Sequence, residues 1–343
     1  MKTIKIKYVG FFPGFDHHQV IAQELLNKHY NVEITEGDDA DYVFCGVFGN
    51  AYEYCKYPQI RVMWSAENYI PDLNFVDYII SPYPIQLFDR CFQYPTYAQC
   101  YGRFYELAKK DRCYTKDILN EKVYFANFIA SHESEYNLRG DFFKKLCEYK
   151  RVESPGSYLN NMPNGERVNW QTGSKAELQK KCKFTLCFES TKHEGFVTEK
   201  IVDAFYADTI PVYYGSDTVK EVFNEKAFIN VADYPSFDAV IEKIKELDQD
   251  DEKYLEMLAQ PILIDKERAL KIESDLEKFL CSIIDQPYEK AYRRSRVYTP
   301  ARYERHVRTA MKIMYAGRNA LDKIKKFFSI PFIWLKRLFK KKK

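Results

Sequence analysis

The feature that most constrains the fold is an alternation of short apolar runs with helix-like segments. In the first eighty residues the apolar runs, each bounded by turn residues, are Ile4–Val9, Val32–Thr35, Tyr42–Cys45, Ile60–Trp64 and Asp77–Ile80. A helix-like stretch at residues 18–27 separates the first two runs. Strands that alternate with helices form parallel sheets whose crossover connections are helical. The pattern therefore predicts an α/β fold.

The alternation restarts after a polar, charged stretch at residues 101–121, which we interpret as an interdomain linker. Beyond it, strands are predicted at residues 123–130, 184–188 and 210–214, with helices at 138–149 and 198–207. At 343 residues the chain is also longer than one ordinary core requires. We expect two α/β domains, residues 1–115 and 116–285, followed by a helical segment at residues 286–343.

The segment at residues 184–205 reads F-T-L-C-F-E-S-T-K-H-E-G-F-V-T-E-K-I-V-D-A-F. Ligands of open α/β sheets bind beyond the carboxyl ends of strands, and the loop at residues 189–197 has this position. A helix that starts at Thr198 favours an anion such as a diphosphate, and Lys200 adds a positive charge. Glu199 can accept hydrogen bonds from two sugar-like hydroxyls. The plain alternative is a capped helix whose first turn is merely solvated.

This segment resembles the donor-site signature of glycosyltransferase family 10, the α-1,3/1,4-fucosyltransferases, which is approximately F-x-L-x-F-E-N-S followed by Y-V-T-E-K. The likeness continues through residue 215 and residues 228–234, and in pieces across residues 5–260. The chain departs from the pattern where Ser190 replaces the usual Asn and Phe196 the usual Tyr, and each change loses a polar contact. The resemblance implies that GDP-fucose is bound by Ser190, Phe196, Thr198, Glu199 and Lys200.

Two further matches lie upstream of this segment. Residues 61–71 read R-V-M-W-S-A-E-N-Y-I-P, and the resemblance makes Glu67 the catalytic base, which takes the proton of an acceptor hydroxyl. Arg139, in Y-N-L-R-G-D, resembles the family's phosphate-binding arginine, and a guanidinium fork suits phosphate oxygens. A loop carboxylate and a surface arginine are the plain alternatives. His17, His18 and Asn68 are predicted to contact the acceptor; the plain alternative for the two histidines is that they merely begin the first helix.

The resemblance implies a GT-B architecture, with two facing Rossmann-like domains that bind the acceptor and GDP-fucose respectively. It also implies an inverting transfer of fucose, to O3 or O4 of an N-acetylglucosamine or glucose unit in a surface glycan or lipopolysaccharide. No metal or other cofactor is expected, because Asp39-Ala40-Asp41 precedes a strand and is interpreted as a turn. The alternatives are a transferase that uses another GDP-deoxysugar and a non-catalytic, membrane-associated glycan-binding protein.

The charge of the chain is concentrated at its C-terminal end. Residues 317–343 contain ten lysines and arginines against the single acid Asp322, whereas the whole chain has a net charge of only +3. A mildly acidic body with a basic, amphipathic tail does not suit nucleic acid but suits an anionic membrane surface, as in bacterial family members. The nine cysteines lack CxxC spacing, which favours a reducing compartment. We expect a cytoplasmic protein on the inner face of the cell membrane; the oligomeric state is left open.

Overall fold

The computed structural model describes residues 1–12, 14, 16, 21–50, 52–99, 102–169, 171–295 and 297–340, with side chains as far as Leu321. The chain forms two compact units. Unit 1 consists of Met1–Trp64, Pro71–Ile79 and Gln286–Lys343, and unit 2 consists of Ser65–Ile70 and Ile80–Asp285. Each unit is built on its own α/β core.

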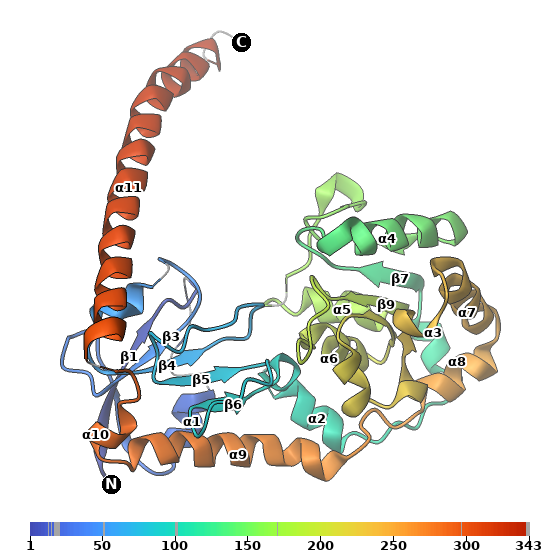
Figure 1. The fold of residues 1–343 in the computed structure, drawn as a ribbon. Helices are drawn as coiled ribbons and strands as arrows, with labels where there is room; N and C mark the ends of the chain where they lie inside the picture. The colour runs from blue at the N-terminus through green and yellow to red at the C-terminus, as the bar shows by residue number, and fades with distance from the viewer. Residues whose placement is uncertain are drawn as a thin grey trace. The chain divides into compact units, whose positions relative to one another are not determined.

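The first sheet has the strand order β2-β1-β3-β4-β5-β6. Its strands are β1 (Thr3–Val9), β2 (Asn31–Ile34), β3 (Tyr42–Cys45), β4 (Ile60–Trp64), β5 (Tyr78–Ser81) and β6 (Cys91–Gln93). β1 runs parallel to β2 and β3, and β3 runs parallel to β4, side by side in Figure 1. Helix α1 (Ile21–Asn27) packs on β2. The five strands expected in this half are confirmed, whereas β6 was not expected.

The second sheet, in unit 2, has the order β11-β10-β9-β7-β8, and every neighbouring pair is parallel. Its strands are β7 (Tyr124–Phe128), β8 (Val152–Glu153), β9 (Cys182–Phe188), β10 (Ile210–Tyr214) and β11 (Ile229–Asn230). Helix α4 (Leu138–Tyr149) connects β7 to β8, and α6 (Glu199–Tyr206) connects β9 to β10 (Figure 1). The predicted parallel α/β arrangement is confirmed.

Both faces of the second sheet are covered, and the alternation of side chains along β9 shows how. Phe184 and Phe188 belong to the core beneath α4 and α7 (Phe237–Gln249), where the Phe142 ring lies 5.0 Å from that of Phe188. Cys187 faces the other way, and its Sγ donates to the carbonyl of Lys200 in α6. Helices α5 (Ser174–Lys180), α8 (Asp251–Leu258) and α9 (Lys266–Ile284) complete this unit.

The stretch predicted as a linker contains two helices and belongs to unit 2. Helices α2 (Arg103–Lys109) and α3 (Ile118–Glu121) occupy it, and α2 buries Phe104 against α6. Its charges have partners distant in sequence, since Arg103 pairs with Asp203 and Lys110 with Asp208. The linker prediction is therefore wrong, and the expected division at residues 115 and 116 differs from that of the compact units.

The C-terminal segment returns to unit 1. Helix α10 (Tyr288–Ala291) precedes α11 (Tyr298–Lys340), a continuous helix that confirms the predicted helical tail (Figure 1). The buried carboxylate of Asp77 accepts from Arg294 Nε at 2.9 Å, and buried Arg61 pairs with Glu304 Oε1 at 2.9 Å. These two ion pairs attach the segment to unit 1. Among the described helices, none is long and apolar enough to cross a membrane.

Candidate functional site

The predicted donor residues gather where the strand order of the second sheet reverses. After β7 the chain adds β8 on one side of that strand and then returns to add β9 on the other. Ligands of open α/β sheets bind beyond the carboxyl ends of the strands at such a switch point. The loop after β7 leads to Arg139 and the loop after β9 leads to Lys200, and Glu135 N joins the loops by donating to Ser190 O at 3.1 Å. The fold thus brings the two predicted phosphate-binding cations to the same end of the sheet.

Glu189, the first residue after β9, is the centre of a hydrogen-bonded cluster. Its side chain is completely buried. Its Oε1 accepts from Thr198 N at 2.8 Å and from Thr198 Oγ1 at 2.9 Å, and its Oε2 accepts from Lys200 Nζ at 2.9 Å. Thr198 is at the N-cap position of α6, but its hydroxyl bonds Glu189 and makes no cap bond within the helix. The carboxylate therefore holds the start of α6 through both Thr198 and Lys200.

The charges around this cluster keep Lys200 protonated. Burial works to lower the pKa of Lys200, but the carboxylates of Glu189 and Glu199 outweigh it, so the pKa is raised above its ordinary value. Partial burial of Glu199 disfavours its charge, yet Lys200 and Lys175 lower its pKa below the ordinary value. The side chain of Glu199 is 44% exposed. It is therefore ionised and accessible, as a residue that binds hydroxyl groups requires.

Arg139 has buried hydrogen-bond donors with no partner. The residue is only 3% exposed, and neither its Nε nor its Nη2 finds an acceptor among the described residues. Glu133 Oε1 lies 3.8 Å from Nε, which is within ion-pair range but too far for a hydrogen bond. Desolvation lowers the pKa of Arg139, although Glu133 and Glu189 oppose the shift. An unsatisfied buried guanidinium is costly unless an anion such as a phosphate completes its bonds.

The backbone that presents Arg139 is strained. Tyr136 and Asn137, just before α4, have φ angles of 58° and 57°, which side chains other than glycine rarely adopt. The turn is held by Glu133, whose Oε1 accepts from Ser134 N at 2.7 Å and whose other oxygen accepts from the Tyr158 hydroxyl. Strain of this kind persists only where the surroundings enforce it, and it clusters at functional sites.

The loop of Glu67 and Asn68 also belongs to unit 2. Ser65 N donates to Ile80 O at 2.9 Å, and Thr96 Oγ1 donates to Ala66 O at 2.9 Å, which fixes both sides of the loop. Partial desolvation raises the pKa of Glu67; the charge of Glu199 raises it further, while Lys200 and His132 lower it. Glu67 thus lies in the electrostatic field of the donor motif, as a base that acts beside a bound donor requires.

Asn68 and Phe196 both contact Tyr83. The Tyr83 hydroxyl donates to Asn68 Oδ1, and its ring stacks on that of Phe196 with centroids 6.3 Å apart and planes at 13°. Phe196 is 4% exposed, so it packs the donor loop rather than presenting its ring to solvent. Ser190 is half-buried, and its carbonyl receives the bond from Glu135 described above. Donor binding by Phe196 and Ser190 stays a prediction.

Two of the predicted site residues are not described by the structure, and three residues of the site were not predicted from the sequence. His17 and His18 lie outside the described residues. Over the described part of the chain there is no cluster of three His, Cys, Asp or Glu residues that could hold a metal ion. Sequence reasoning missed Glu133, Glu189 and Tyr83. Only Glu189 carried a signal, because it follows the apolar strand directly within the recognised motif.

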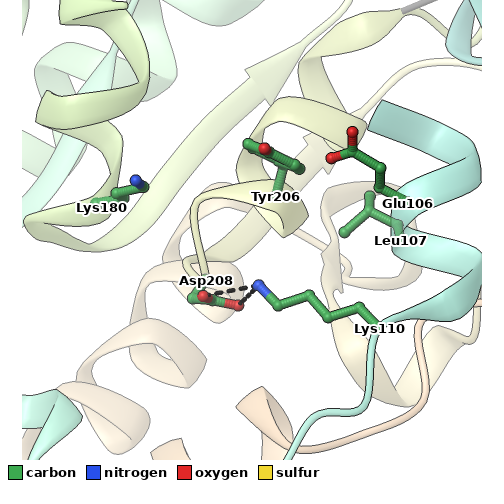
Figure 2. A pocket seen from close by; sticks show the side chains of 6 residues that line it. All are labelled: Glu106, Leu107, Lys110, Lys180, Tyr206 and Asp208. Carbon is green, nitrogen blue, oxygen red and sulfur yellow. Dashed lines mark hydrogen bonds and ion pairs between the residues drawn. The ribbon is translucent and has the colours of Figure 1, made fainter. Parts of the chain in front are cut away.

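An open hollow of about 410 Å³ lies at the other end of α6 (Figure 2). It is lined by Glu106, Leu107, Lys110, Lys180, Tyr206 and Asp208. Figure 2 shows Lys110 reaching both carboxylate oxygens of Asp208, at 2.7 and 2.8 Å. The C-terminal end of a helix carries partial negative charge, which disfavours a diphosphate. The donor motif, at the N-terminal end of the same helix, has the opposite polarity.

Comparison with known proteins agrees with this geometry. The sequence profile described as "Glycosyltransferase family 10 (fucosyltransferase) C-term" matches residues 119–298, and that described as "Alpha-(1,3)-fucosyltransferase FucT N-terminal domain" matches residues 6–101. The chain is 30% identical over 269 residues to the alpha-(1,3)-fucosyltransferase FucT of Helicobacter pylori, covering 68% of this chain and 54% of that protein. It is 36% identical over 130 residues to human 4-galactosyl-N-acetylglucosaminide 3-alpha-L-fucosyltransferase 9, covering 37% and 34% of the two chains. The chain thus spans about half or less of the length of these relatives.

Solved structures show the same fold. The crystal structure of an alpha1,3-fucosyltransferase matches with a TM-score of 0.65 and 26% identity, over 81% of this chain and 90% of that one. An alpha1,3-fucosyltransferase with GDP-fucose matches with a TM-score of 0.63 and 25% identity, over 84% and 93% of the two chains. The fold is therefore GT-B, α/β with two Rossmann-like units. Because the family 10 profile covers more than half of its residues, the protein belongs to glycosyltransferase family 10, the fucosyltransferases.

Proposed function

We propose that the protein is an inverting fucosyltransferase, which moves L-fucose from GDP-fucose to a hydroxyl group of an acceptor glycan. The observation that carries the proposal is that two guanidinium nitrogens of buried Arg139 lack hydrogen-bond acceptors among the described residues. Arg139 lies at the sheet's switch point, near Lys200 and the positive end of α6. A matching solved structure is of an alpha1,3-fucosyltransferase with GDP-fucose, which supports the choice of donor.

In this proposal the GDP diphosphate completes the hydrogen bonds of Arg139. The free Nε and Nη2 of Arg139 match two phosphate oxygens, and the ammonium of Lys200 and the first amides of α6 add positive potential. Glu199, ionised and 44% exposed, accepts hydrogen bonds from the ribose hydroxyls. Negative charge that develops on the departing GDP is then stabilised by fixed cations, which is the function that a metal ion serves in other transferases.

The base in the proposed reaction is Glu67. The acceptor oxygen attacks the anomeric carbon of fucose from the face opposite GDP, and its proton passes to the Glu67 carboxylate as the bond to the diphosphate breaks. This single displacement inverts the anomeric configuration. Partial desolvation and the nearby Glu199 raise the pKa of Glu67, which makes it a better proton acceptor than a fully solvated glutamate.

A donor panel tests the proposal. The protein is incubated with GDP-fucose or other GDP-deoxysugars, with N-acetylglucosamine and N-acetyllactosamine-type acceptors, and the GDP released is measured. Acceptor-dependent release from GDP-fucose that is lost in Glu67→Ala and Lys200→Ala is the expected result. Release from another GDP-deoxysugar alone would identify a different donor. If no donor is consumed and the variants match the parent, the protein is not a transferase.

For the acceptor we propose O3 or O4 of an N-acetylglucosamine or glucose unit in a surface glycan or lipopolysaccharide. We further propose that residues 317–343, with ten basic residues, bind the anionic inner face of the cell membrane from the cytoplasm. Flotation with anionic liposomes, before and after truncation at Gly317, tests this attachment. Equal flotation of both forms would exclude it, whereas loss of flotation on truncation is expected.

A further inference from the structure

We propose that Glu189 is a positioning residue of the donor site, which fixes the Lys200 ammonium and the start of α6 where the diphosphate binds. The inference rests on the proposed function, because it concerns the same site. The Glu189 carboxylate is completely buried, which keeps it from direct contact with a donor. It therefore acts through other residues.

The hydrogen bonds that the Glu189 side chain accepts from described residues all come from the start of α6. Thr198 N, Thr198 Oγ1 and Lys200 Nζ donate to its two oxygens at 2.8 to 2.9 Å, and Lys200 Nζ also donates to Thr198 Oγ1 at 2.9 Å. A carboxylate accepts several hydrogen bonds, and these occupy both of its oxygens. The ammonium of Lys200 therefore has two fixed acceptors, and its position follows from that of Glu189.

Glu189 is itself held rigidly. Its N–H donates to the carbonyl of Tyr214 at 2.8 Å, at the end of the neighbouring strand β10. Gly215 leaves the space that the side chain needs, since a Cβ at that position would lie 2.6 Å from Glu189 Cγ. The carboxylate is thus fixed to the sheet, and through it the first turn of α6 is held in place relative to β9 and β10.

The charge of Glu189 is needed as well as its shape. Arg139 and Lys200 are two cations that converge on one proposed diphosphate, and they repel each other when no donor is bound. Burial raises the pKa of the Glu189 carboxyl, and the ion pair with Lys200 opposes that shift. The ionised carboxylate attracts both cations, Lys200 through a direct bond and Arg139 through space. A buried carboxylate here lets both cations stay in place before the donor arrives, which is the preorganisation that a site for charged ligands requires.

A double-mutant cycle with Glu189→Gln and Lys200→Met tests the inference, read by GDP affinity in calorimetry and by kcat/KM for GDP-fucose. Glutamine keeps the size of Glu189 but turns amide hydrogens toward an ammonium. Glu189→Gln is expected to lower both quantities by roughly 10- to 100-fold. In a Lys200→Met background the same change should have a smaller effect, because the part of its action that passes through Lys200 is already lost and only the contacts with Thr198 and Arg139 remain.

The matched control is Asp248→Asn, which also neutralises a buried carboxylate of unit 2 but one that pairs with Lys150 and Lys183. It should leave GDP affinity unchanged. The inference is overturned, while the proposed function stands, if the fold-losses of GDP affinity caused by Glu189→Gln and Lys200→Met simply multiply in the double variant. It is also overturned if Glu189→Gln alone leaves GDP affinity unchanged. Non-additive GDP binding without any fucose transfer would instead overturn the proposed function alone. A wild-type protein that binds no GDP would overturn both.

Discussion

Replacing Arg139 with methionine should make the protein more stable and bind GDP less well. Methionine fills a similar volume without polar atoms. In the structure the guanidinium is 3% exposed, and two of its nitrogens have no acceptor among the described residues. The protein therefore retains a buried, unsatisfied cation, which is explicable if a bound anion completes its hydrogen bonds.

The size of both effects follows from those two nitrogens. An unsatisfied buried donor costs about 1–3 kcal/mol, so Arg139→Met should raise the free energy of unfolding by about that amount after the weak attraction to Glu133 is lost. For a chain of 343 residues that unfolds as one, each kcal/mol raises Tm by roughly 1–2 °C. Two charge-assisted hydrogen bonds to phosphate contribute about 3 kcal/mol or more, so GDP affinity should fall by at least about 100-fold.

The assay is thermal unfolding of the ligand-free protein together with calorimetric titration of GDP. Arg268→Met is the control, because Arg268 is exposed on α9 and should change neither quantity beyond experimental error. A less stable Arg139→Met protein with unchanged GDP affinity would refute the reasoning, since Arg139 would then be satisfied by the protein itself.

Three further predictions test other parts of the structure. Burial lowers the pKa of Lys122 to about 8 from its ordinary 10.5, so between these pH values the unfolded state binds more protons than the folded state. The free energy of unfolding of the wild type, measured in urea relative to that of Lys122→Met, should therefore rise by about 3 kcal/mol from pH 7 to 10.5. A difference between the two proteins that does not change with pH would contradict this. Glu67→Gln should lower kcat by about 100-fold or more and leave GDP affinity unchanged. Besides desolvation, the charge of Glu199 raises the pKa of Glu67, so Glu199→Gln should move the acidic limb of the pH–rate profile to lower pH. An acidic limb that does not move would argue against Glu67 as the base. Gly156→Ala should destabilise unit 2 by about 1–3 kcal/mol in urea unfolding, since a Cβ would collide with the backbone of Ala130; unchanged stability would show that this loop adapts.

The sequence predicted those features that depend on local pattern. Buried parallel strands are continuous apolar runs, and β1, β3, β4, β9 and β10 lie close to where such runs placed them. The strand, loop and helix that carry the donor motif also follow one another directly, so their order could be predicted locally. The functional roles of the motif residues rest on the resemblance to family 10.

The features that were missed depend on partners far apart in the chain. The charges of Arg103 and Lys110 suggested a solvated linker, but Asp203 and Asp208, about a hundred residues away, pair with them. The return of the C-terminal segment to unit 1 rests on Arg294 and Asp77, which no local pattern connects. Glu189 lies within the donor motif, but the motif alone does not predict its burial, because that burial becomes favourable only once Lys200 folds back onto it.

Fucose transfer with inversion is tested most directly by analysing the product that the wild-type chain forms from GDP-fucose and an N-acetylglucosamine or N-acetyllactosamine-type acceptor. Mass spectrometry detects the added fucose, and NMR gives the anomeric configuration of the new bond. The expected result is a fucosylated product whose anomeric configuration is opposite to that of the donor. A folded protein that binds GDP yet forms no fucosylated product across the acceptor panel, or a product with the donor's configuration, would contradict it.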